Sequence, residues 1–153
     1  MKAHKILMVI IVAIALTGAS MAKDAPRYAT IARLSGVAEV MKPDGAWIEA
    51  HRGMSLPQGS SIRTKEGANM ALSIDGRSQT ALVEVKQNTT ISLAELTRGS
   101  GGAKKTLLDL AIGDVLIKVK KMPSEESKFE VRTPISYIGV RGTIFSVSLK
   151  RSE

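Results

Sequence analysis

The feature that most restricts the fold of this chain is a repeated alternation of apolar and polar side chains with a period of two. Val115, Ile117 and Val119 share one parity, and Leu116 and Lys118 share the other. Side chains on a β-strand point to opposite faces in turn, so such a segment has one face for the core and one for solvent. Similar alternation is present at 70–75, 80–85, 128–133 and 143–149. The spacing does not fit an α-helix over a useful length, so the sequence predicts an all-β domain.

Turn signals separate these segments, and long helices are not expected between them. The Pro-Asp-Gly triplet at 43–45 predicts a tight turn, because proline presets its backbone angle and glycine accepts positive φ. Asp75 and Gly76 predict a hairpin. Residues 92–96 form the one ambiguous segment, since they could also form a single helical turn.

The choice between two all-β architectures depends on glycine and on aromatic side chains. Glycine opens several short apolar runs, as at Gly36, Gly53 and Gly113, which suits a chain that coils in stacked turns. Aromatic residues make up only 3% of the chain, so the expected core is aliphatic and fits a solenoid slightly better than an aromatic-centred sandwich. The expected fold is an all-β, twisted β-solenoid-like or sandwich-like stack of short strands, preceded by an N-terminal signal helix.

Residues 1–22 have the organisation of a secretory signal peptide. Two lysines precede an apolar run at 6–16, and small residues lead to Ala22, so cleavage is expected between Ala22 and Lys23. The run of about 11 residues is shorter than the roughly 20 that a helix needs to cross the hydrocarbon layer. The alternative is an uncleaved anchor over residues 6–21.

The chain contains no cysteine, which excludes disulfides, thiol catalysis and cysteine-ligated metal sites. An exported domain of about 130 residues can still be stabilised by the burial of apolar side chains. A bacterial periplasm or outer surface is the expected location. The expected divisions of the chain are a signal peptide at 1–22, a lead-in at 23–33, the all-β domain at 34–149 and a tail at 150–153.

Two short segments near the C-terminus carry a specific pattern, which we call the C-terminal motif. Its residues are Thr133, Pro134, Gly139, Val140, Arg141, Gly142, Thr143 and Phe145. This motif, with weaker matches upstream, resembles the signature of the FecR domain family over residues 34–149. The resemblance implies a periplasmic all-β module, and the best-known members control a sigma factor in response to a loaded siderophore receptor. A signal peptide stands here where those regulators have a cytoplasmic segment, so we infer an exported FecR-type module and not that regulatory role.

The C-terminal motif has a structural and a functional interpretation. Pro134 has no N–H to donate, so it should end the strand before it. Gly139 and Gly142 allow tight turns or a close backbone approach on either side of Arg141. We interpret Arg141 as a partly buried side chain that bonds loop carbonyls with several of its donors. The alternative is that its guanidinium group binds an anionic ligand or partner.

The sequence offers no recognisable catalytic or metal site. His51 is the only histidine after residue 22, so there is no second imidazole for a metal site or a catalytic triad. The carboxylates are scattered, and the glycine-rich segment at 99–102 is not followed by a helical pattern. We therefore expect a protein that is not an enzyme and that needs no cofactor.

Basic residues outnumber acidic ones, and the formal net charge is +8. The candidate basic surface comprises Lys104, Lys105, Lys118, Lys120 and Lys121. Outside the cytoplasm, such a surface attracts lipid headgroups, cell-wall polymer or acidic protein rather than nucleic acid. The simpler interpretation is a solvated face whose lysines discourage edge-to-edge pairing of strands.

These observations predict a non-catalytic binding, scaffold or signalling module of the bacterial cell envelope. Its partner would be an envelope protein or polymer, and capture could use an added strand at an open sheet edge. No stable membrane span is expected after cleavage. The alternative function is the binding of an anionic envelope polymer through the lysines. Salt separates the two, because charge-driven binding weakens as ionic strength rises.

Overall fold

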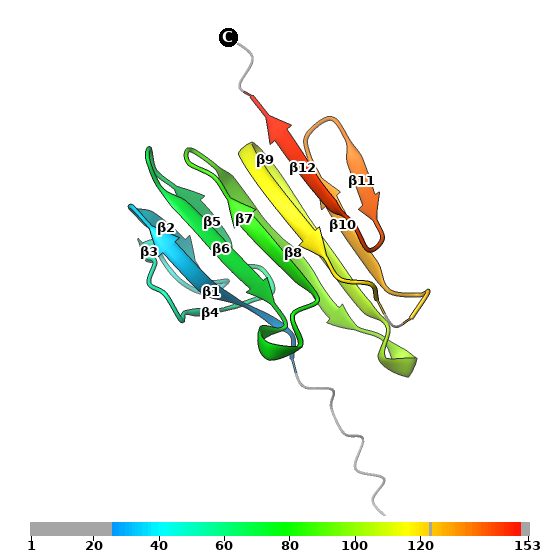
Figure 1. The fold of residues 1–153 in the computed structure, drawn as a ribbon. Coiled ribbons are helices and arrows are strands. Elements are labelled where there is room, and N and C mark those ends of the chain that lie inside the picture. Colours follow the sequence, from blue (N-terminus) through cyan, green and yellow to red (C-terminus); the bar gives the residue numbers. More distant parts are fainter. Residues whose placement is uncertain (1–25, 123, 151–153) are drawn as a thin grey trace, which may run out of the picture.

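The computed structural model describes residues 26–122 and 124–150, which form a 12-stranded sheet curled into a half-barrel (Figure 1). This confirms the prediction of an all-β fold. The predicted signal helix and its cleavage site lie outside the described residues. Among the described segments, no helix has the length and apolar character needed to cross a membrane.

The strands fall into two half-sheets along the curl. The first half-sheet contains β1 (Tyr28–Ser35), β4 (Ser55–Pro57), β6 (Asn69–Ile74), β7 (Ala81–Val85) and β12 (Ile144–Leu149). The second contains β2 (Ala38–Met41), β3 (Ile48–Glu49), β5 (Ser61–Thr64), β8 (Thr90–Arg98), β10 (Lys128–Arg132) and β11 (Tyr137–Val140). The long strand β9 (Lys104–Val119) belongs to both. Two 3₁₀ turns, η1 (Gly76–Ser78) and η2 (Ser100–Gly102), connect β6 to β7 and β8 to β9.

Strand β9 and the segment from β1 to β2 join the two half-sheets most directly. Strand β9 pairs with β8 and β10 over its first half and with β7 and β12 over its second half. Strand β1 continues into β2 through Gly36, whose φ is +77°. A Cβ atom at this position would lie 2.8 Å from the Cα of Ala68, so only glycine fits the bend. Because strands distant in sequence pair around a common core, the fold is nearer to the sandwich-like prediction than to the solenoid-like one.

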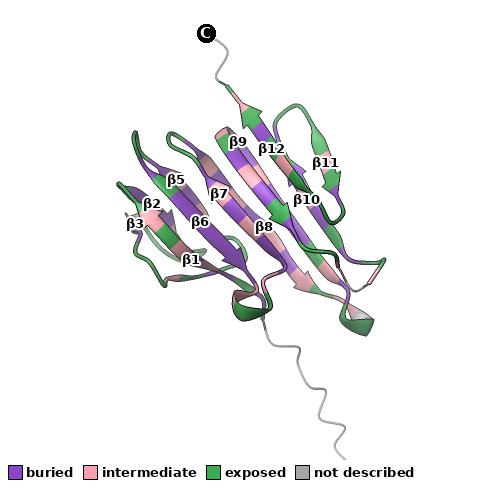
Figure 2. Ribbon diagram, in the orientation of Figure 1, coloured by how far each residue is buried: buried purple, intermediate pink, exposed green. Residues whose placement is uncertain are grey.

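The inner faces of the strands form an aliphatic core (Figure 2). Val115, Ile117 and Val119 are buried, as the alternation predicted. The largest fully buried side chains are Phe129, Ile31, Leu56, Ile62, Leu72, Ile74, Ile91, Leu93, Leu108, Leu110, Ile117 and Val40. Phe129 is the one aromatic residue among these, so the predicted aliphatic character of the core is confirmed.

The turn signal at 43–45 is confirmed, and the structure also decides one open assignment and moves one boundary. The turn at 43–45 is present, and the Gly45 N–H donates a 3.0 Å hydrogen bond to the Lys42 carbonyl. Residues 92–96 belong to β8, because pairing with β5 and β9 decides their ambiguous pattern in favour of a strand. Strand β1 starts at Tyr28, so residues 28–33, expected as a lead-in, are part of the sheet.

Candidate functional site

The first half of the C-terminal motif closes the turn between β10 and β11. The Thr133 N–H donates a 2.8 Å hydrogen bond to the Ser136 carbonyl across this turn. Pro134 lies inside the turn, so β10 ends before it, as the missing N–H of proline predicted. This part of the motif therefore shapes the backbone.

The second half of the C-terminal motif attaches the last strand to the core. Val140 ends β11 and is buried, and Phe145 in β12 is half-buried against the core. Immediately before β12, the Thr143 carbonyl accepts a 3.0 Å hydrogen bond from the Val119 N–H of β9. These contacts support the structural interpretation for most of the motif.

Arg141 is exposed, whereas the sequence analysis placed it as partly buried. It lies in the turn that follows Val140, the last buried residue of β11, and therefore projects beyond the core. Its Nη2 donates a 2.9 Å hydrogen bond to the Glu125 carbonyl, so the expected bond to a loop carbonyl is present. An exposed arginine with one such bond contributes little to folding, which leaves its guanidinium group accessible to a ligand.

The C-terminal motif contains Gly139 and Gly142, and the backbone conformation requires glycine only at position 142. Gly142 has a φ of +54°, a left-handed conformation that strains residues with a Cβ atom. Gly139 has no such φ, and a Cβ atom there would meet no atom within 4 Å beyond its chain neighbours. Backbone geometry therefore explains glycine at 142 and does not explain it at 139.

A hollow of about 490 Å³ lies beside this corner. It is lined by Lys121, Met122, Ser124, Glu125, Ser127, Arg141 and Gly142. The hollow brings Arg141 and Gly142 of the C-terminal motif together with Lys121 of the candidate basic surface. The motif and this lysine belong to separate segments of the sequence. It is one place where residues of both predicted groups lie close together.

Strands β11 and β12 each pair on one side only, so their other edges are open (Figure 1). Hydrogen-bonded positions alternate along an antiparallel pair. Because Thr143 bonds to β9, the backbone groups of Ile144, Ser146 and Ser148 point to the open edge of β12. Thr133 and Ser136 form a hydrogen-bonded pair between β10 and β11. The alternation along β11 therefore directs the backbone groups of Tyr137 and Gly139 to its open edge.

Large apolar side chains are exposed on these two strands and in the β10–β11 turn beside them. Ile135 is 85% exposed, Tyr137 56% and Ile144 65%. Strand β12 has the sequence Ile-Phe-Ser-Val-Ser-Leu and carries no charge. Proteins usually protect an edge strand with lysine, proline or a bulge, and β12 has none of these devices.

The structure divides the candidate basic surface instead of gathering it. Lys104 is turned inward, and its Nζ lies 3.0 Å from an Asp75 carboxylate oxygen. The Lys118 Nζ lies 3.5 Å from a carboxylate oxygen of Glu84. The exposed members are Lys105, near the start of β9, Lys118 within it, and Lys120 and Lys121, after Val119 at its end. The five lysines therefore do not form one binding face.

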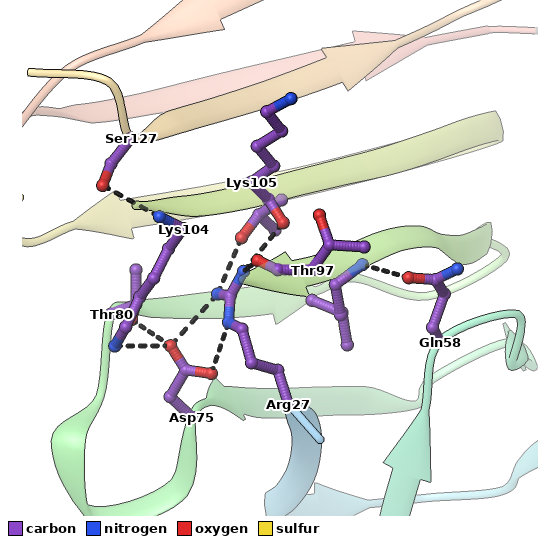
Figure 3. A network of polar contacts seen from close by, with 10 residues as sticks. Arg27, Gln58, Asp75, Thr80, Thr97, Lys104, Lys105 and Ser127 are labelled. Atoms are coloured by element: carbon purple, nitrogen blue, oxygen red, sulfur yellow. Dashed lines mark hydrogen bonds and ion pairs between the residues drawn. The ribbon is translucent and has the colours of Figure 1, made fainter. Parts of the chain in front are cut away.

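A buried polar network, missed in the sequence, holds the N-terminal end of the sheet (Figure 3). The Arg27 side chain is 1% exposed and that of Asp75 is 6% exposed. The Arg27 Nε and Nη2 donate to the two Asp75 carboxylate oxygens at 2.8 and 3.0 Å. The other Arg27 bonds reach the carbonyls of Thr97 and Lys105 and the hydroxyl of Thr106. One side chain thus joins the start of β1 to β8, β9 and the β6–β7 connection.

The Asp75 carboxylate is held in its ionised form. Burial opposes ionisation, but hydrogen bonds from Arg27, Thr80 and Lys104 outweigh it and lower the Asp75 pKa from 3.8 to about 2. Its oxygens are occupied by these donors, so the group is not available as an acid or base. We interpret the network as structural, with Arg27 in the buried role that the sequence analysis gave to Arg141.

The structure gives the positions of the histidine and of the acidic side chains. His51 is exposed in the loop between β3 and β4. Within residues 26–122 and 124–150, no three His, Cys, Asp or Glu side chains are placed to hold a metal ion. That the protein is not an enzyme stays a prediction from the sequence.

Comparison with known proteins adds the family. The model of the family described as FecR protein matches residues 60–153. This match covers more than half of the chain and includes β5 to β12 and the C-terminal motif. No curated protein and no solved structure matches the chain. The match to the family model shows that the chain belongs to the FecR protein family.

Proposed function

We propose that this protein is a non-catalytic binding, scaffold or signalling module of the bacterial cell envelope that holds a protein partner at strands β11 and β12. FecR proteins form a signalling and regulatory family, which supports a role in contact and not in catalysis. The signal peptide expected at residues 1–22 supports export to the periplasm or the outer surface.

One observation carries the proposal: β12 is an open edge without charge. Ile144, Ser146 and Ser148 direct backbone groups away from β9, and Ile144 is exposed beside them. An extended segment of a partner can pair with such an edge through main-chain hydrogen bonds, while alternate side chains supply specificity. The unprotected edge favours a partner that covers it, because an uncovered edge of this kind promotes aggregation.

The test is site-specific cross-linking in intact cells. p-Benzoylphenylalanine in place of Tyr137 or Ile144 is expected to give an adduct of one defined mass, identified by mass spectrometry. The control position is Ile48 on β3, which is 47% exposed but lies at the other end of the sheet. Adducts of equal yield from Ile48 would contradict the assigned surface.

A second pair of variants tests whether the contact is an added strand. Ser146→Pro removes an N–H from the open edge and should abolish the adduct at Ile144, whereas Ser146→Thr keeps the N–H and should retain it. A strong adduct from Ser146→Pro would refute strand addition.

The alternative function, binding of an anionic polymer through the lysines, predicts a different dependence on salt. Cross-linking in isolated envelopes at about 50 and about 500 mM sodium chloride separates the two, because exposed charges are screened at the higher concentration. A strand-addition contact should persist at high salt. Loss of the adduct at high salt would favour charge-driven binding through the lysines over strand addition.

Export has its own test. Edman sequencing of the protein from the envelope fraction should return Lys23 as the first residue. A chain that keeps Met1 and fractionates with the cytoplasm would refute the location.

A further inference from the structure

A second hollow, of about 460 Å³, lies on the first half-sheet, over β1, β6 and β7. Strand register places Arg33, Ala71 and Glu84 in one row across these three strands, and Ser35 and Asn69 opposite each other in the next row. Ala71, which lies between the long side chains of Arg33 and Glu84, has a short side chain, as does Ser35 in the next row. These short side chains form the floor of the hollow. Arg33, Glu84 and Lys86 line the walls together with Arg52 from the loop between β3 and β4.

Positive charge exceeds negative charge at this hollow. Its lining contains Arg33, Arg52 and Lys86 but a single carboxylate, Glu84. That carboxylate already lies within 3.4 to 3.5 Å of three cations, which are Arg33, Lys86 and Lys118. The Arg33 side chain is 67% exposed, and its contact with Glu84 is long at 3.5 Å. Because these three cations share one carboxylate, most of their N–H donors are not used by Glu84.

The loop that carries Arg52 is fixed against β1. The Gly53 N–H donates a 2.8 Å hydrogen bond to the Ile31 carbonyl, and the Met54 N–H donates to the His51 carbonyl at 3.2 Å. Ile31 in turn donates its N–H to the Met54 carbonyl at 3.0 Å. Arg52 is therefore held beside the strand that carries Arg33, although the two residues are far apart in the sequence.

We propose that this hollow binds an oxyanion of the phosphate type, with the guanidinium groups of Arg33 and Arg52 as its main donors. Guanidinium groups bind phosphate and carboxylate oxygens through two parallel N–H donors, which gives geometry as well as charge. Asn69 adds an amide group and Lys86 adds a positive charge at the rim. None of the five lysines of the predicted basic surface lines the site, although Lys118 contacts Glu84 at its wall. The site lies away from the open edges of β11 and β12, so it does not depend on the proposed partner contact.

The primary test is an NMR titration of the full mature protein with inorganic phosphate, against sodium chloride at matched ionic strength. The Nε–Hε signals of Arg33 and Arg52 and the side-chain amide of Asn69 should shift with phosphate and stay in place with chloride. The variant Arg33→Gln/Arg52→Gln should bind phosphate about tenfold more weakly or worse, because hydrogen bonds to a charged group are lost.

The matched control is Lys120→Gln/Lys121→Gln, which removes the same charge outside the hollow and should change phosphate affinity less than about twofold. Equal losses in the two variants would overturn the proposal, because net charge and not a site would then explain binding. Absence of shifts at Arg33 and Arg52 would overturn it as well.

Vesicles distinguish two sources of the phosphate group. Binding to phosphatidylglycerol–phosphatidylcholine vesicles, but not to phosphatidylcholine alone, that is lost in Arg33→Gln/Arg52→Gln would assign the site to lipid headgroups. The site would be assigned to soluble or polymer-borne phosphate if the wild type binds phosphate specifically but does not bind these vesicles. The same assignment would follow if Arg33→Gln/Arg52→Gln loses phosphate binding but binds the vesicles as the wild type does. Either result leaves the cross-linking test at Ile144 unchanged, so failure here and failure of the proposed function can be told apart.

Discussion

Replacement of Arg27 by methionine should be among the most destabilising single changes in the described part of this protein. The variant keeps much of the side-chain volume and removes the charge and every donor. The Arg27 side chain is 1% exposed and makes five hydrogen bonds, two of them to the Asp75 carboxylate. Three go to neutral oxygens, which at about 1 kcal/mol each already suggests a loss of about 3 kcal/mol in the free energy of unfolding.

The stranded Asp75 adds to this loss. Removing one partner of a buried ion pair costs about 3–5 kcal/mol, because the other charge remains in a poor solvent. Lys104 and Thr80 still contact Asp75, so we expect the lower part of that range. A domain of this size has about 5–15 kcal/mol of stability, so the variant should lose a substantial fraction of it.

Urea unfolding followed by circular dichroism measures the effect. The control is Arg33→Met, which removes an arginine from an exposed pair with Glu84 and should cost about 0–1 kcal/mol. A change of less than about 1 kcal/mol for Arg27→Met, or equal changes in the two variants, would refute the argument that burial makes this network important.

Three further outcomes are expected. The Asp75 pKa is lowered from 3.8 to about 2, so the stability from its ionised form is complete above about pH 4 and is lost as the pH falls toward 2. Urea midpoints of the wild type should fall by more than those of Asp75→Asn over that window. Gly142→Ala should lower the free energy of unfolding by about 1 kcal/mol through its positive φ, while Gly139→Ala should leave it equal or slightly higher; a reversed order contradicts the backbone argument. Phe129→Ala should cost about 3–5 kcal/mol in calorimetry, since it opens a cavity in the core. A cost below about 1 kcal/mol would show that the core collapses around the gap.

The sequence predicted the strands well where side chains alternate between solvent and core. Val115, Ile117 and Val119 were assigned correctly, because burial of one face is a local property of the strand. Residues 92–96 were ambiguous because only pairing with β5 and β9, which are distant in sequence, makes them part of β8. Local pattern therefore determined the elements, and tertiary pairing determined their extent.

The polar sites could not be predicted in the same way. Arg27 and Asp75 are 48 residues apart, and the turn signal at Asp75 and Gly76 says nothing about a buried partner for the carboxylate. The pattern that drew attention to Arg141 reflects a turn with a positive φ at Gly142, so it says more about the backbone than about a buried guanidinium. Lysines that share parity in the sequence, such as Lys118 and Lys120, meet different neighbours once the sheet curls. The arginine hollow depends on a loop folding back on β1, which no local pattern encodes.

The two proposed contact sites share one face of one half-sheet, which allows a test of their independence. Register places Arg33, Ala71, Glu84, Leu116 and Ser146 in a single row from the hollow to the open edge of β12. Four strand spacings of about 4.8 Å separate the ends of this row, or roughly 20 Å along the sheet. The Debye length is about 8 Å at physiological salt, so an anion in the hollow should be screened from a strand at β12. Cross-linking yield at Ile144 should therefore be the same in the wild type and in Arg33→Gln/Arg52→Gln, within about twofold. A marked loss of yield in that variant would mean that the sheet transmits binding from one site to the other and that the two contacts form one functional surface.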